Sequence, residues 1–349
     1  MKTAKKKSSN LASLLIADRF SGKTCPKKHI QRNSVTQFTP LLMLNEKLTI
    51  ENKPISNSKY TPESTEALQV KYEKLIASMD CSLSIPPRVP HEFVEAGDFK
   101  QLENFVFNCW KYSHNDKVFE RNIEIWRQFW ITCERSTTIA QILDARDPLA
   151  YFNEDILKFY PEKNHVLLIN KLDLDKNAEK KLLMLGAKNV QVYAYSTRNS
   201  TFDFCLSGTI GLIGYPNVGK SSTINMILHQ KKVKVSSTPG KTKLIQTIET
   251  PNFTLLDCPG LVFPCHSKIE LVLMGILNID QITDLHKYEQ CVVNRIGVGT
   301  LKRFYRIADS ECDFLTAMSL QKGWVKSKCL KMIAKDYAMG EIPAPFADS

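Results

Sequence analysis

The sequence predicts an α/β protein: a mainly parallel sheet with helices on both faces, a basic extended arm before it and an all-helical domain after it. Short apolar runs, each closed by a polar residue or glycine, alternate with helix-length segments between residues 138 and 257. Helical periodicity resumes after Pro264, and the first 33 residues contain nine basic residues and one acidic residue. Strands that are apolar on both faces and separated by helices indicate a covered parallel sheet.

The composition of the 349 residues excludes several classes of protein. A hydrophobic fraction of 43% and a charged fraction of 24% are typical of globular chains and exclude fibrous, mucin-like and wholly disordered ones. No apolar run reaches the ~18 residues that a membrane-spanning helix needs, so no membrane contact is expected. The ten cysteines form no C-x-x-C pair and no zinc-spaced cluster with histidine. Reduced thiols in a cytosolic or nuclear protein are the simplest interpretation.

The positive charge is concentrated at the start of the chain. Residues 1–33 have a net charge of +8, out of +11 for the whole sequence. With Ser, Asn and Gly between the charges, this arm cannot bury enough apolar surface to fold alone and suits contact with phosphates. A solubilising or nuclear-import tail is the alternative. Residues 34–97 are expected to be an extended linker, with a helix around 63–79 and successive prolines near its end that forbid another.

The remaining elements are expected in a simple order. Apolar residues recur at helical intervals from 98 to 135 and predict leading helices. The apolar runs predict strands at 138–144, 165–170, 190–195, 209–214 and 253–257. Helical patterns then predict helices at 268–277, 288–295, 299–305 and 324–339. We therefore expect one domain over residues 98–264 and a C-terminal helical domain over residues 265–349.

Gly214–Ser221 follows a predicted strand and has the form G-x-x-x-x-G-K-S. Its glycines let backbone N–H groups turn toward a β-phosphate, and the following helix adds its partial positive charge. Lys220 is expected to bridge the β- and γ-phosphates, and the Ser221 hydroxyl to bind Mg²⁺. A chance glycine turn is the alternative, and the strand–loop–helix context argues against it. The expected triphosphate site also includes Asn217, Val218, Gly219 and Ser222.

Asn170-Lys171-Leu172-Asp173 follows another predicted strand and indicates which base binds. The Asp173 carboxylate can accept hydrogen bonds from N1–H and the exocyclic amino group of guanine, whereas adenine lacks that pair of donors. Asn170 is expected to brace the loop and reach the base, and the stem of Lys171 to cover the ring. Backbone groups around Ser196 are a further candidate contact to guanine O6. GTP and GDP are therefore the expected ligands.

Asp257-Cys258-Pro259-Gly260 ends a third predicted strand and has the form D-x-x-G. Asp257 is expected to reach Mg²⁺ through water, and the N–H of Gly260 to meet the γ-phosphate. Between the two phosphate motifs, Thr242 is the expected second protein ligand of Mg²⁺, once its segment orders over GTP. An ordinary hairpin turn is the alternative for that segment.

The three motifs occur in an unusual order. Ordinary GTPases have the phosphate loop first, whereas here N-K-x-D precedes the phosphate loop and D-x-x-G comes last. A circular permutation of this kind preserves the site when the spatial neighbours are kept. It also joins D-x-x-G directly to the C-terminal helices, so motion of this switch is expected to reach them.

With Asp144–Pro148 ahead of N-K-x-D, this order resembles the circularly permuted YlqF/YawG-type GTPases. Residues 120–130, 258–264 and 275–281 are similar to the eukaryotic cytoplasmic large-subunit GTPases, and the similarity covers residues 86–340. The long acidic insertion that relatives carry before the phosphate loop is short here. Their C-terminal extension is nearly absent.

The resemblance implies a fold and an activity. The fold is a circularly permuted P-loop GTPase domain followed by helices, and the activity is Mg²⁺-dependent hydrolysis of GTP to GDP and phosphate. The implied partners are the large ribosomal subunit with its rRNA and ribosomal proteins, and the nuclear-export adaptor released from it in the cytoplasm. The free protein is expected to be a monomer. The alternatives are an RNA-binding assembly scaffold with little hydrolysis, and a nucleolar or mitochondrial member of the same family.

Leu261 follows D-x-x-G, where Ras-like enzymes have the glutamine that orients the attacking water. Because leucine cannot orient water, slow intrinsic hydrolysis is expected. Asn217 resembles the asparagine that holds K⁺ beside the phosphates in related GTPases, so K⁺-assisted hydrolysis is expected. The candidate catalytic residues are Lys220, Asn217, Thr242 and Gly260.

Overall fold

The structure is a computed structural model that describes residues 79–90, 96–175, 190–198, 207–229, 244–282 and 284–342. The expected arm of residues 1–33, the helix expected before residue 79 and Thr242 lie outside the described residues. The chain forms two compact units, one holding described residues up to 115 and the other those from 116 onward. None of the described helices is long and apolar enough to cross a membrane.

The smaller unit is built on helix α4 (Ala96–Ser113). The proline-rich residues 86–90 before it form no helix, and they pack against α4. Val89 is buried with Leu102 and Val106 in a small apolar cluster. Arg88 Nη1 donates to the buried carboxylate of Glu103 at 2.7 Å. Burial of a carboxylate requires such a partner, so this ion pair holds the extended segment to α4.

The larger unit contains a six-stranded sheet in the order β3-β2-β1-β4-β6-β5. The parallel strands are β1 (Thr138–Asp144), β2 (Asn164–Asn170), β3 (Gln191–Ala194), β4 (Gly208–Ile213) and β6 (Phe253–Asp257). They coincide within a residue or so with the five predicted strands, which confirms the predicted fold class. Antiparallel β5 (Gln246–Glu249) was not predicted. It lies at the edge with only Ile248 buried, so it has no continuous apolar run.

Helix α5 (Ile123–Arg135) packs beside β4 and brings a large aromatic core to the sheet. Trp126, Phe129 and Trp130 are fully buried, and the indole N–H of Trp126 donates to the carbonyl of Glu120 at 2.7 Å. A Cβ at Gly211 of β4 would lie 2.4 Å from Ser136 Oγ, so the absence of a side chain there permits this close packing.

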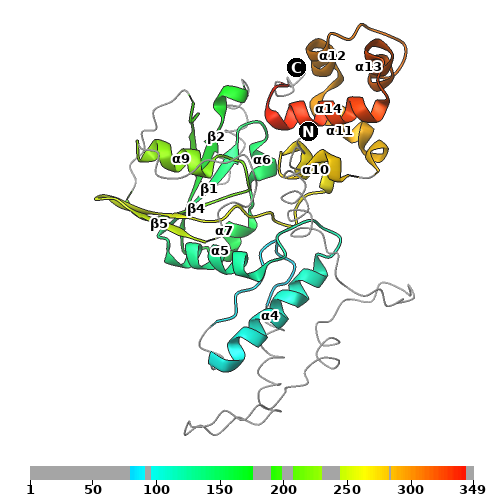
Figure 1. Ribbon diagram of the computed structural model, residues 1–349. Helices are drawn as coiled ribbons and strands as arrows, with labels where there is room; N and C mark the ends of the chain where they lie inside the picture. The colour runs from blue at the N-terminus through cyan, green and yellow to red at the C-terminus, as the bar shows by residue number, and fades with distance from the viewer. Residues whose placement is uncertain are drawn as a thin grey trace, which may run out of the picture. The chain divides into compact units, whose positions relative to one another are not determined.

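Residues 265–342, here called the helical segment, contain α10 (Lys268–Leu273), α11 (Glu289–Ile296), α12 (Val298–Tyr305), α13 (Phe314–Lys322) and α14 (Lys326–Met339). Figure 1 shows these helices gathered beyond one end of the sheet. They share one apolar core, in which Leu301, Met318 and Leu330 are fully buried. The all-helical prediction is confirmed, although α13 was not predicted. The buried residues of α13 lie in its first half, so the helical periodicity of apolar residues in its sequence is short.

Short elements complete the edge of the sheet where the candidate site lies. Helices α6 (Pro148–Tyr151) and α7 (Asp155–Phe159) follow β1, and α9 (Lys220–Ile227) follows β4. The 3-10 turn η2 (Leu172–Leu174) follows β2. Helix α6, helix α9 and the turn η2 are each the first element after a parallel strand, and α7 follows α6. The loops that bear the three motifs therefore meet at the carboxyl edge of the sheet, where ligands bind in folds of this kind.

Candidate functional site

The loop between β4 and α9 has a backbone that requires glycine at two positions. Gly214 has φ +148° and Gly219 has φ +100°. A Cβ at Gly214 would lie 2.6 Å from the carbonyl oxygen of Ile142, and one at Gly219 would lie 2.2 Å from Asn170 Nδ2. Among the described residues no side chain caps the start of α9, so its first N–H groups are available to a ligand. This is the geometry of an anion-binding loop at a helix N-terminus.

Lys220 is the first residue of α9 and is only 9% exposed. Its Nζ donates to the carbonyl oxygens of Gly214 at 2.8 Å and Tyr215 at 2.7 Å. Burial lowers the pKa of Lys220 to about 8, although the nearby carboxylate of Asp257 acts in the opposite direction. The ammonium group is therefore held inside the phosphate loop and is still mostly charged at neutral pH.

Asp257 ends β6 and is 1% exposed. Burial raises the pKa of its carboxyl group to about 6, against the effect of the charge on Lys220. Its Oδ2 is buried and makes no hydrogen bond to any described residue. A buried carboxylate oxygen with no partner, near the hydroxyl-bearing first turn of α9, fits a hard divalent cation such as Mg²⁺. Ser221 and Ser222 lie in that turn and are partly buried.

The loop after β2 is tied to the phosphate loop through Asn170, whose side chain is buried. Its Nδ2 donates to the carbonyl of Val218 at 3.0 Å. Its Oδ1 accepts from the backbone N–H of Lys171 at 2.7 Å and of Thr197 at 3.3 Å. One amide therefore joins three loops, at the ends of β2, β3 and β4.

Asp173 lies in η2, next to the loop after β3. The hydroxyl of Ser196 donates to Asp173 Oδ1 at 2.6 Å, and Arg198 Nη1 lies 3.5 Å from Oδ2. Sequence reasoning considered only backbone groups around Ser196 and missed this role of its side chain. Because β2 and β3 are parallel neighbours, with Ile169 beside Ala194, the residues that follow each strand meet.

The D-x-x-G loop packs on the phosphate loop. A Cβ at Gly260 would lie 3.1 Å from Pro216 Cα, and the N–H of Leu261 donates to the carbonyl of Gly214 at 3.3 Å. The Leu261 side chain is 1% exposed and belongs to the buried core. Asn217 has φ +64°, and its Nδ2 donates to the carbonyl of Gly275 in the helical segment at 2.8 Å. Of the candidate site residues, only Thr242 lies outside the described residues.

The structure adds Asp144 and Arg146 to the site. The sequence analysis used these two residues only as part of the family resemblance. Asp144 ends β1 beside Asn170 of β2 and is fully buried. Its Oδ2 accepts from Lys171 Nζ at 2.8 Å and from Arg146 Nη2 at 2.9 Å, and its Oδ1 accepts from Arg146 Nε at 3.0 Å. Lys171 Nζ also donates to the carbonyl of Asn217 at 2.7 Å. Asp144 therefore positions the lysine that joins the base loop to the phosphate loop.

Burial alone would raise the pKa of Asp144, but Arg146 and Lys171 outweigh it and lower the pKa to about 2. Because this lies below the ordinary value of 3.8, the ionised carboxylate stabilises the fold above pH ~4. That stabilisation, about 2 kcal/mol, is lost as the pH falls through 2. We expect the difference in unfolding free energy between the unmodified chain and Asp144→Asn to shrink by this amount between pH 5 and pH 2.

Urea unfolding at a series of pH values measures this difference. Asp280→Asn is the comparison variant: hydrogen bonds from Lys335 and Lys331 lower the pKa of Asp280 too, but its carboxylate is solvent-exposed, so we expect a smaller change with pH than for Asp144→Asn. A difference for Asp144→Asn that stays constant over this range would contradict the role of its charge.

The comparisons with known proteins agree with this geometry. The family described as "50S ribosome-binding GTPase" matches residues 209–294. The chain is 31% identical over 350 residues to Large subunit GTPase 1 of Schizosaccharomyces pombe, which covers 73% of this chain and 57% of that protein. It is 28% identical to GTPase LSG1-2 of Arabidopsis thaliana, over 74% of this chain and 61% of that protein. The chain thus spans about three fifths of the length of these curated relatives.

Among solved structures, GNP-bound YlqF from T. maritima is similar, with 21% identity and a TM-score of 0.45 over 62% of this chain and 94% of that chain. The decisive feature is in the chain itself. The N-K-x-D loop follows β2, the phosphate loop follows β4 and D-x-x-G begins at the end of β6. The three motifs, in their permuted order, therefore lie at the ends of parallel strands of one sheet. The chain therefore carries the motifs of a GTPase in circularly permuted order on one sheet, and it is similar to relatives named large subunit GTPases.

Proposed function

We propose that this protein binds and hydrolyses GTP, and that it does so on the large ribosomal subunit during late cytoplasmic maturation. One observation carries the nucleotide part of the proposal. The loops after β2, β4 and β6 are bonded to one another through Asn170 and Leu261, so a base-reading loop, a phosphate loop and a metal-binding carboxylate face one site.

Each residue has a distinct task in this proposal. Asp173, held by Ser196, accepts hydrogen bonds from guanine. Lys220 and the N–H groups of the phosphate loop bind the phosphates. Ser221, Asp257 and Thr242 would hold Mg²⁺, which would supply positive charge to the phosphates.

Hydrolysis forms a bond between a water oxygen and the γ-phosphorus and breaks the bond to the β–γ bridging oxygen, which leaves GDP and phosphate. Because Leu261 is buried, this chain offers no side chain at that position to orient the water. The Asn217 amide is fixed by its bond to the Gly275 carbonyl. Its oxygen then remains free to hold K⁺ beside the phosphates, which would supply positive charge in the transition state.

The ribosomal part of the proposal rests on the names of the relatives and the family, and on the charge of the chain. A net charge of +8 in residues 1–33 suits contact with rRNA. In this proposal the arm anchors the protein on the subunit, ribosomal proteins complete the contact, and hydrolysis accompanies release of the nuclear-export adaptor.

We expect GTP hydrolysis to be slow for the isolated protein and faster by at least about tenfold with purified large subunits in KCl. Replacing KCl with NaCl at equal ionic strength should remove most of the acceleration, because Na⁺ carries the same charge but is smaller and more strongly hydrated, and the ligands of a K⁺ site would not hold it beside the phosphates. Phosphate release under single-turnover conditions measures both effects.

A chain that lacks residues 1–33 is the control for anchoring. It should bind subunits more weakly and with a shallower salt dependence, while its GDP affinity is unchanged. Equal rates with and without subunits, in both salts, would leave a GTP-binding scaffold as the better description.

A further inference from the structure

The geometry points to a direct coupling between the last turn of α14 and the base-binding loop, through Arg146, Asp144 and Lys171. In this inference, docking of the helical segment sets the affinity for guanine nucleotides from the base side of the site. The triphosphate-sensing D-x-x-G switch is not required, so GDP and GTP are affected alike. The inference rests on the proposed role of Asn170–Asp173 as the guanine loop.

The first step of this coupling is the contact of Arg146 with α14. Arg146 Nη1 donates to the carbonyl oxygens of Tyr337 at 2.8 Å and Ala338 at 3.2 Å. These belong to the last turn of α14, whose carbonyls carry partial negative charge; that of Tyr337 also accepts from the N–H of Gly340 at 3.0 Å. A buried guanidinium therefore completes the end of a helix that lies about 190 residues later in the chain.

The second step runs from Arg146 to the nucleotide loops. The same guanidinium donates to both oxygens of Asp144, which in turn accepts from Lys171 Nζ. Lys171 has φ +67°, a backbone conformation that costs a non-glycine residue free energy unless its surroundings hold it. Loss of the α14 carbonyls would remove two acceptors of the buried guanidinium, and its position relative to Asp144 would change.

A second contact reaches the same loop without passing through Asp144. Gly340 ends α14 with φ +79°, and a Cβ there would lie 3.0 Å from Leu174 Cδ1. Leu174 belongs to η2, the turn that carries Asp173. The end of α14 therefore packs directly on the turn that is proposed to recognise guanine.

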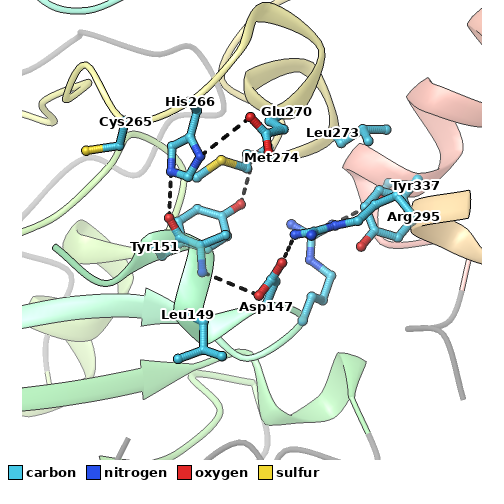
Figure 2. Close-up of a pocket in the computed structure, with 12 residues that line it drawn as sticks. Asp147, Leu149, Tyr151, Cys265, His266, Glu270, Leu273, Met274, Arg295 and Tyr337 are labelled. Carbon is cyan, nitrogen blue, oxygen red and sulfur yellow. Dashed lines mark hydrogen bonds and ion pairs between the residues drawn. The ribbon is translucent and has the colours of Figure 1, made fainter. Parts of the chain in front are cut away.

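Other contacts fix the helical segment to the loop after β1, around a cavity of about 440 Å³. Figure 2 shows the ion pair between Arg295 and Asp147 and the hydrogen bond from the Tyr151 hydroxyl to the carbonyl of Met274, which is 3.0 Å long. His266 Nε2 donates to the carbonyl of Ala150 at 2.7 Å. These contacts do not touch the nucleotide loops, so they can hold the helical segment in place when the end of α14 is perturbed.

Two glycines of the helical segment allow a matched test. Gly340 and Gly323 both follow a helix in the left-handed conformation, with φ +79° and +66°, but a Cβ at Gly323 would meet nothing within 4 Å. Gly340→Ala and Gly323→Ala therefore introduce similar backbone strain, and only the first presses on Leu174. We expect Gly340→Ala to weaken binding of GDP and of a non-hydrolysable GTP analogue by about fivefold each, and Gly323→Ala to change neither.

Calorimetric titration of the full chain measures these affinities. Equal affinities for the two variants would overturn the inference. So would a loss confined to the triphosphate, because the coupling would then run through the D-x-x-G switch. Failure of the unmodified chain to bind GDP would instead overturn the proposed function.

The reciprocal measurement needs no variant. Because coupling between sites acts in both directions, GDP should slow amide hydrogen exchange in the last turn of α14, residues 337–340. The exchange at the end of α13 should be unchanged. Arg146→Lys, which keeps the charge but lacks the fork that reaches both Asp144 and α14, should abolish this GDP effect. Exchange in residues 337–340 that does not respond to GDP in the unmodified chain would also overturn the inference.

Discussion

Replacement of Lys220 with alanine is expected to lower the affinity for GTP by at least about 100-fold and the affinity for GDP by at least about tenfold. A hydrogen bond from a charged donor contributes about 1.5–3 kcal/mol, and Lys220 would make two such bonds to GTP, at the β- and γ-phosphates, but only one to GDP. The ammonium group is already inside the phosphate loop, bonded to the carbonyls of Gly214 and Tyr215. Little reorganisation is therefore needed before phosphate binds.

The matched control is Lys268→Ala. Lys268 is also the first residue of a helix, α10, but it is exposed and far from the phosphate loop in sequence. Titration with a fluorescent GDP analogue compares the two variants, and thermal unfolding checks that each is folded. Affinities for Lys220→Ala within about threefold of the unmodified chain would contradict its assignment to the phosphates.

The parallel part of the sheet could be predicted because each strand is buried on both faces and leaves an uninterrupted apolar run. Edge strand β5 has one buried residue, Ile248, and leaves no such signal. Helix α13 does carry a local signal that could have found it. The side chain of Asp313 caps its first turn by accepting from the N–H of Thr316 at 2.9 Å.

The three nucleotide motifs could be predicted because each is a contiguous segment whose spacing follows from the shape of a phosphate or a base. The roles of Ser196 and Asp144 depend instead on which strands are neighbours, and strand order is a property of the whole sheet. The contact between Arg146 and Tyr337 joins residues 191 apart in the chain and donates to a backbone carbonyl, which every residue type provides. No local pattern marks such a partner.

Asp173→Asn is expected to change the base preference of the site from guanine to xanthine. Guanine presents two donors, N1–H and the C2 amino group, whereas xanthine has a carbonyl oxygen at C2. Ser196 donates its hydroxyl to Asp173 Oδ1 and accepts from the backbone N–H of Arg198. When the amide oxygen of the variant takes the place of Oδ1 and keeps the bond from Ser196, the NH₂ group turns toward the base. There it opposes the amino group of guanine and donates to the C2 carbonyl of xanthine.

The expected result is a fall in GDP affinity of at least about 100-fold and a rise in xanthosine diphosphate affinity of similar size, since a site built for one hydrogen-bonding pattern rejects the other strongly. Competition between the two nucleotides measures the exchange, and Asp280→Asn serves as an acid-to-amide control in the helical segment. The substitution keeps both the size of the side chain and its bond to Ser196, so the fold is not expected to change. A reversal of preference therefore assigns base recognition to Asp173, whereas an equal loss for both nucleotides would show that its carboxylate only supports the loop.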